Sequence, residues 1–159
     1  MSRCVFPGSF DPVTKGHLDI IQKASKMFDH VTVAVMINAH KNGWIPPKDR
    51  VRLLENCLRE YQNVHTELWE GLLADYMKLH GETIVVRGAR SGTEFEAETI
   101  SATVNRKLNP AIQTVIIPAD AEMSCISSSA VREILLFGGD PRPFLPEEAA
   151  EEIVEALSK

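Results

Sequence analysis

The sequence has few cysteines, no long apolar run and no excess of positive charge. Its three cysteines, Cys4, Cys57 and Cys125, lie far apart without any CxxC pair, which argues against a disulfide framework or a zinc site and fits free thiols in a reducing compartment. The apolar stretch 31–37 is too short to span a bilayer, and the N-terminus has no long apolar core. We therefore expect a soluble cytoplasmic protein that does not enter a membrane.

Positive charge is also scarce, because 17 lysines and arginines face 22 aspartates and glutamates, for a formal net charge of -5. This balance argues against a protein that binds nucleic acid through bulk positive charge. Any phosphate site should therefore be a local cationic pocket for a small ligand.

Two familiar phosphate-binding patterns are missing as well. No G-x-G-x-x-G follows the first predicted strand, and no G-x-x-x-x-G-K-[ST] loop occurs, so hydride transfer and P-loop hydrolysis are disfavoured.

There is no repeat, no low-complexity segment and no dividing linker. With 159 residues, 44% of them hydrophobic, the chain is expected to form one domain over 1–159.

Hydrophobic periodicity predicts short strands that alternate with helices. Strands are predicted at 3–6, 31–37, 64–68, 83–86 and 114–117, and helices from 15, from 47, over 72–79, over 94–107, from 128 or 129 to 137, and finally around 153–157. Such alternation implies right-handed crossovers and a parallel sheet. The predicted fold is a single Rossmann-like α/β domain whose five-stranded parallel sheet, in the order 3-2-1-4-5, is flanked by helices and followed by a C-terminal helix.

Capping residues and prolines predict where the helices begin and end. Thr14 is expected to cap the first helix, and Thr93 with Glu96 has the spacing of a capping box. Ser128 or Ser129 is expected to cap the helix that runs through Phe137. Pro47 suits the first position of the second helix. The apolar side of that helix is predicted to carry Val51, Leu54, Leu58 and Tyr61.

The stretch 5–17 runs from a short apolar strand through a turn into a helix start. Lys15, Gly16 and His17 would fill the first helical turn, whose free N–H groups and positive dipole end suit an anion. Ordinary connection chemistry explains the same glycine and prolines, so spacing alone leaves both readings open. In a sheet of this order the ligand crevice lies between the first and fourth strands. Their loops carry 9–17 and 87–90, so both candidate segments meet there.

The segment Ser9-Phe10-Asp11-Pro12, followed by Thr14-Lys15-Gly16-His17, resembles the T/H-x-G-H signature of the nucleotidyltransferase superfamily. A second signature reads Ile-Ser-Ser-Ser-Ala-Val-Arg over 126–132, and Arg-Gly-Ala-Arg lies between them at 87–90. Together these motifs resemble the bacterial phosphopantetheine adenylyltransferase family over nearly the whole chain. The resemblance implies transfer of the adenylyl group of ATP to 4′-phosphopantetheine, which gives dephospho-coenzyme A and pyrophosphate in coenzyme A biosynthesis.

The resemblance also assigns roles to residues. It implies that His17 and Lys41 are catalytic, and that Ser9, Lys41, Leu73 and Arg87 bind phosphopantetheine. It implies that ATP is bound by Ser9, Phe10, His17, Gly88, Ala89, Arg90, Glu98, Met123, Ser124, Cys125, Ile126, Ser127, Ser128 and Ser129.

Plainer readings of these residues compete with the assigned roles. Lys41 can be a solvated surface lysine, and the serine run can be a helix cap. The arginines at 87 and 90 can form surface ion pairs with Glu94, Glu96 or Glu98, which contribute little energy. Glu98 can also be an ordinary exposed helix carboxylate.

Further expectations concern partners and departures from the family pattern. Mg²⁺ would accompany ATP and be held mainly by the nucleotide. Dephospho-coenzyme A or coenzyme A would bind as product or inhibitor, and the family pattern implies a homohexamer of two trimers. Ala97, Met123 and Cys125 stand where related sequences often have aromatic residues, so adenine packing can differ. The rival functions are an enzyme of the same superfamily with another acceptor, such as nicotinamide mononucleotide or, with CTP, glycerol 3-phosphate, and a non-catalytic nucleotide-sensing module.

Overall fold

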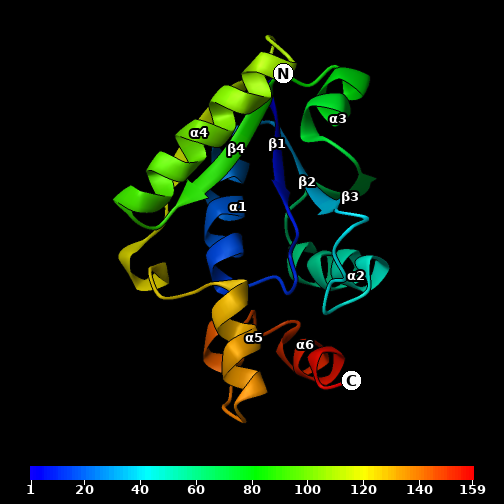
Figure 1. Ribbon diagram of the computed structural model, residues 1–159, viewed down its shortest axis with the longest axis vertical. Helices are drawn as coiled ribbons and strands as arrows, with labels where there is room; N and C mark the ends of the chain where they lie inside the picture. Colours follow the sequence, from blue (N-terminus) through cyan, green and yellow to red (C-terminus); the bar gives the residue numbers. More distant parts are fainter.

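A five-stranded parallel sheet forms the centre of the computed structural model, which describes residues 1–159 (Figure 1). Its order is β3-β2-β1-β4-β5, as predicted. The strands are β1 (Arg3–Gly8), β2 (His30–Ile37), β3 (Val64–Glu70), β4 (Ile84–Ala89) and β5 (Gln113–Pro118). The predicted fold class and strand order are therefore confirmed.

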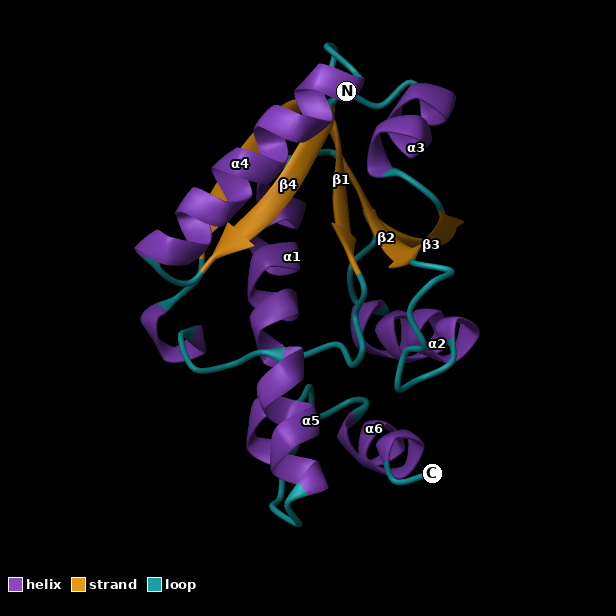
Figure 2. Ribbon diagram, viewed as in Figure 1, coloured by secondary structure: helices purple, strands orange, loops and turns teal.

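Six helices connect or follow the strands (Figure 2). They are α1 (Lys15–Met27), α2 (Pro47–Leu58), α3 (Leu73–His80), α4 (Gly92–Leu108), α5 (Ser128–Leu136) and α6 (Ala150–Leu157), with short 3₁₀ turns η1 (Ala121–Met123) and η2 (Arg142–Phe144). None of these helices combines the length and the apolar character that a membrane crossing requires.

Thr14 caps α1 as predicted, but the caps of two other helices were predicted wrongly. Ser91 caps α4 by accepting a hydrogen bond from the Glu94 N–H, so the helix begins before Thr93. Ser127 caps α5. Ser128 is not the cap because its hydroxyl donates a hydrogen bond to the Pro12 carbonyl, 2.7 Å away. A long-range contact thus decided between neighbouring serines that are equally able to cap a helix.

The two faces of the sheet are covered unequally. A cluster of 24 buried residues joins one face to α1, α2, α5 and α6, whereas the cluster beneath α3 on the other face has seven. Helix α4 crosses this second face in front of β4 (Figure 1), yet none of its 17 residues is buried. The second face is therefore left with a long helix that the chain itself does not bury.

The buried face of helix α2 differs from the prediction. Leu54 and Leu58 are buried as expected, while Val51 is only half-buried and Tyr61 lies beyond the end of the helix. The burial of Arg50 was not predicted. Apolar periodicity cannot identify a buried charge, because such a charge depends on partners elsewhere in the fold.

Candidate active site

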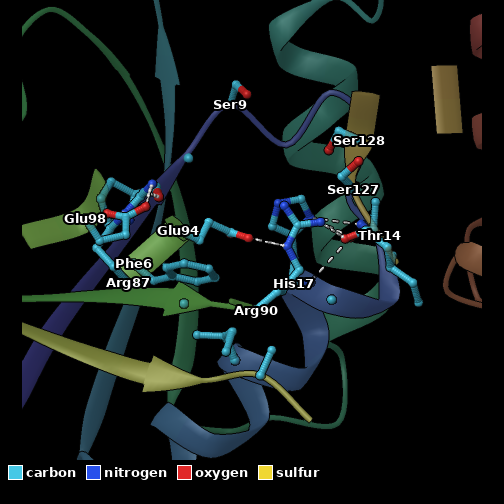
Figure 3. Close-up of a pocket in the computed structure, with 17 residues that line it drawn as sticks. Phe6, Ser9, Thr14, His17, Arg87, Arg90, Glu94, Glu98, Ser127 and Ser128 are labelled. Carbon is cyan, nitrogen blue, oxygen red and sulfur yellow. Dashed lines mark hydrogen bonds and ion pairs between the residues drawn. The ribbon is translucent and has the colours of Figure 1, made fainter. Parts of the chain in front are cut away.

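A cavity of about 230 Å³ opens at the carboxyl ends of β1 and β4. Its walls come from the loop after β1, the first turn of α1, the end of β4, the start of α4 and the start of α5. Figure 3 shows His17 and Thr14 beside Ser127 and Ser128, with Arg87 and Glu98 across the cavity. The crevice thus lies between the two strands where the predicted topology placed it.

His17 and its helix cap, Thr14, are joined by three polar contacts, one of which is the 3.1 Å approach of Thr14 Oγ1 to His17 Nδ1. The backbone N–H of Thr14 donates to Nδ1 of His17, 3.0 Å away, and Thr14 Oγ1 accepts from the His17 backbone N–H at 3.4 Å. A backbone N–H can only donate, so Nδ1 is the unprotonated ring nitrogen. The ring proton of the neutral imidazole is therefore on Nε2, and His17 has one N–H left to offer a ligand.

The surroundings of His17 keep this imidazole neutral. Burial, together with the smaller effect of the positive charges of Arg87 and Arg90, lowers its pKa from 6.5 to about 4. At neutral pH the side chain is therefore a hydrogen-bond donor without a net charge.

Phe10 lies behind His17. Its ring is buried, with the ring centroid 4.8 Å from that of His17 and 5.6 Å from that of Phe6. Its φ of 47° lies in the left-handed region that bulky residues rarely adopt. The packing of the ring holds this backbone conformation, so the ring supports the His17 side chain and is not part of the cavity wall.

Both candidate arginines line the cavity, and both are paired with carboxylates of α4. Arg87 Nε and Nη2 donate to the two oxygens of Glu98 at 2.8 Å, and Nη1 donates to the Pro7 carbonyl at 2.6 Å. Arg90 Nε lies 2.9 Å from Glu94. The two arginines therefore form ion pairs and line the cavity at the same time. Their partners are Glu98 and Glu94, and not Glu96.

Glu98 is not the exposed carboxylate that the plainer reading described, since its side chain is only 13% exposed. It lines the cavity where Arg87 does. Glu94 also lines the cavity and was not among the predicted site residues. Its spacing of four from Arg90, the spacing of a helical ion pair, was the signal available in the sequence.

Gly88 lets α1 approach the end of β4. A Cβ atom at this position would lie 2.7 Å from Cγ1 of Ile20, closer than packed carbon atoms can be. Ala89, the next residue, is buried at the end of the strand. The small residues between Arg87 and Arg90 therefore bring the first turn of α1 and both guanidinium groups to one cavity.

The segment 123–129 enters the site only in part. Ile126, Ser127 and Ser128 line the cavity, and the Arg90 guanidinium donates to the Ile126 carbonyl. The remaining predicted residues, Met123, Ser124, Cys125 and Ser129, are not part of its lining. Cys125 is exposed.

Lys41 and Leu73 line two neighbouring hollows. Lys41 lies in a hollow of about 560 Å³ on the loop 38–46, and Leu73 lies in another of about 290 Å³ with Arg87 and Glu98. Ser9 lines all three. The loop after β1 is thus the junction at which the predicted nucleotide, acceptor and Lys41 regions meet.

No three His, Cys, Asp or Glu side chains come together in a way that could hold a metal ion. The two carboxylates of the cavity, Glu94 and Glu98, are both paired with arginines. The cavity therefore combines two guanidinium groups with two carboxylates that are already engaged in ion pairs.

Comparison with known proteins shows the family to which the chain is related. Residues 5–134 match the cytidylyltransferase-like family. A protein of Rubrobacter xylanophilus is 44% identical and one of Clostridium kluyveri 42% identical, each over the whole of this chain and 97% of the relative. A protein of Clostridium botulinum is 38% identical over 99% of this chain and 96% of the relative. All three relatives are named phosphopantetheine adenylyltransferase.

Proposed function

The chain belongs to the cytidylyltransferase-like family, and we propose that it transfers the adenylyl group of ATP to 4′-phosphopantetheine, forming dephospho-coenzyme A and pyrophosphate. The enzyme would act in coenzyme A biosynthesis, as its relatives' names indicate. The observation that carries the mechanism is the neutral His17, whose free Nε2–H lies in a cavity lined by two arginines.

The nucleophile needs no base. A phosphate monoester has its second pKa near 6, so the attacking phosphate of phosphopantetheine is mostly a dianion at neutral pH. A histidine with a pKa of about 4 is a poor proton acceptor there. We assign His17 the role of donating the Nε2–H to an α-phosphate oxygen, a contact that strengthens as charge develops in the transition state.

The other phosphate groups of the two substrates have candidate partners around His17. Arg87 would bind the phosphate of phosphopantetheine, and Arg90 would bind ATP together with Gly88, Ala89 and Glu98. The N–H groups at the start of α5 suit the β- and γ-phosphates. The Ser127 hydroxyl also suits them, because it accepts from the Ala130 N–H and keeps its own proton to donate. Carboxylates hold both guanidinium groups in place, so the arginines meet the substrates in a fixed orientation.

Two substrate contacts would come from outside the main cavity. Lys41 would reach the phosphates of both substrates across Ser9, and Leu73 would contact the pantetheine arm in its hollow, mainly through its backbone. Mg²⁺, when bound, would neutralise the triphosphate. We place it on the nucleotide, because the two cavity carboxylates are engaged with arginines.

Pyrophosphate release with each acceptor in turn tests the function. We expect release with ATP and 4′-phosphopantetheine, and none with nicotinamide mononucleotide. Thermal shifts give a second test, since a ligand that binds the folded state raises its stability. Stabilisation by nicotinamide mononucleotide, with none by phosphopantetheine or dephospho-coenzyme A, would overturn the assignment, and nucleotide binding without turnover would favour a sensing module.

We also propose that the chain assembles into a homohexamer of two trimers. Ile100, Val104 and Leu108 recur every four residues along α4 and are 67%, 51% and 56% exposed, so they form an apolar stripe on a helix that buries no residue within the chain. Light scattering that returns a monomer across the micromolar range would refute this assembly without affecting the catalytic assignment. The three free cysteines support a cytoplasmic location, where thiols stay reduced.

A further inference from the structure

A buried ion pair connects the loop after β1 to the start of α2. Arg50 Nη2 lies 3.6 Å from Asp11 Oδ2, and the side chains are only 7% and 9% exposed. Two charges removed from water need good geometry and further hydrogen bonds to offset the loss of hydration. The partners in those hydrogen bonds show which segments of the chain the ion pair connects.

All the remaining side-chain hydrogen bonds of the pair reach the Lys41 loop or Ser9. Asp11 Oδ1 accepts from the Ile45 N–H and Oδ2 from the Trp44 N–H, both at 2.8 Å. Arg50 Nε donates to the Ile45 carbonyl at 2.6 Å, and Nη1 donates to the Ser9 carbonyl at 3.3 Å. The pair therefore fixes the second half of the loop 38–46 to the residue that lines all three hollows.

Gly43 adds an independent observation from the same loop. A Cβ atom at this exposed position would overlap Arg50 Nη2 and lie 2.8 Å from Cζ and 3.1 Å from Asp11 Oδ2. The Arg50 guanidinium thus passes directly under the backbone of Gly43, two residues after Lys41. A side chain here would move the loop or the guanidinium.

We propose that Asp11 and Arg50 are positioning residues, which place Lys41 beside Ser9 by anchoring its loop. The proposal rests on the proposed role of Lys41 as a phosphate contact. Lys41 is exposed, so no packing of its own side chain orients it. Its backbone N–H is bound within the loop, to the Asn38 carbonyl at 3.0 Å, and the Asp11–Arg50 pair orients the loop as a whole.

The sharpest test is Gly43→Ala, because it disturbs the anchor without removing a buried charge. We expect kcat/KM to fall roughly tenfold, the scale of one weakened hydrogen bond to a charged group, with little change in Tm. Gly92→Ala is the matched control, since a Cβ atom there meets nothing within 4 Å. It should leave both kcat/KM and Tm nearly unchanged.

A double-mutant cycle with Lys41→Ala separates positioning from general damage. If the anchor acts through Lys41, Gly43→Ala should have almost no further effect in the Lys41→Ala background. The same fall in both backgrounds would overturn the proposal. Arg50→Lys, which keeps the charge but loses the fork of donors, should show the same non-additivity. Leu54→Ala, a core truncation on the same helix, should lower Tm, and its effect on kcat/KM should be additive with that of Lys41→Ala.

A spectroscopic readout keeps this proposal separate from the proposed function. The chain has two tryptophans, so Trp69→Phe leaves Trp44 as a reporter on the anchored loop. Gly43→Ala and Arg50→Lys should shift the Trp44 emission, and Gly92→Ala should not. An unchanged emission would contradict the anchor even if the protein turned over no substrate, whereas shifted emission with no pyrophosphate release would count against the proposed function alone.

Discussion

The first turn of α1 and the loop 38–46 each present one candidate catalytic residue near Ser9, but they are held in different ways. Thr14 and His17, three residues apart, bind each other at the start of the helix. The Lys41 loop is held by Asp11 across 33 and 34 positions of the chain, and Arg50 reaches Ser9 across 41. One residue is oriented by local bonds, the other by distant ones.

This difference has a chemical consequence. The His17 side chain is itself a member of its capping box, so the same bond fixes the ring orientation and the tautomer. Lys41 makes no such bond through its side chain, and its ammonium group is placed only as well as its backbone. We therefore expect His17 to act by a precisely directed donor and Lys41 by charge, and the following experiments test that contrast.

The largest effect is expected for His17→Ala. Loss of one donor to developing charge typically lowers kcat by about a hundred- to a thousand-fold, and ATP binding should weaken far less, since the contact strengthens mainly in the transition state. Steady-state kinetics measure both quantities, with Lys26→Ala, an exposed position on the same helix, as control. Near-normal kcat with a raised KM for ATP would make His17 a ground-state binding residue.

The pH dependence of stability is the next largest effect. Because the pKa of His17 is about 4 when folded and about 6.5 when unfolded, the unfolded state binds more protons between these values, so stability falls as pH drops from 6.5 to 4. The histidine contributes at most about 3 kcal/mol to this loss. Denaturant unfolding at several pH values should show that the free energy of unfolding depends less steeply on pH for His17→Gln than for the wild type. The pKa of His30 is also lowered, chiefly by burial, so some slope will remain, and an unchanged slope would contradict the neutral buried imidazole.

A smaller effect is expected for Thr14→Ala. The hydroxyl that caps the helix is lost, at a typical cost of about 1 kcal/mol in the free energy of unfolding. Its contact with Nδ1 of His17 is lost too, but the backbone N–H that donates to Nδ1 remains. The variant should therefore lose stability while kcat falls much less than for His17→Ala. Thr14→Ser, which keeps the hydroxyl, should restore stability. A loss of kcat as large as that of His17→Ala would show that the cap hydroxyl itself sets the ring position.

The same contrast explains which features could be predicted from the sequence. The alternation of strands and helices and the cap at Thr14 follow from periodicity and from signals within a few residues. The strand order and the crevice follow from the fold class that this alternation implies. The caps at Ser91 and Ser127 were missed because several neighbouring hydroxyl residues satisfy the local rule, and long-range contacts such as the one from Ser128 to Pro12 select among them.

The burial of Arg50 was missed for a related reason. No local pattern distinguishes an arginine that is buried with a distant aspartate from one on the surface, since the distinction depends on residue 11 and the loop at 43–45. The pairing of Arg87 with Glu98 was foreseen only as a surface alternative. Its bidentate geometry inside the cavity depends on how α4 packs against β4.

The smallest expected effect is a difference between Lys41 and His17 in how their contributions to kcat/KM depend on salt. Lys41 is exposed, and exposed charges are screened over a Debye length of about 10 Å at 0.1 M ionic strength and about 3 Å at 1 M. His17 is neutral and its ring bond is local, so salt should change its contribution little. The ratio of wild-type to Lys41→Ala kcat/KM should therefore fall a few-fold, roughly, between these salt concentrations, whereas the ratio for His17→Ala should stay constant. If both ratios fell together, the two residues would act through the same electrostatic field, and the contrast between a directed donor and an exposed charge would be wrong.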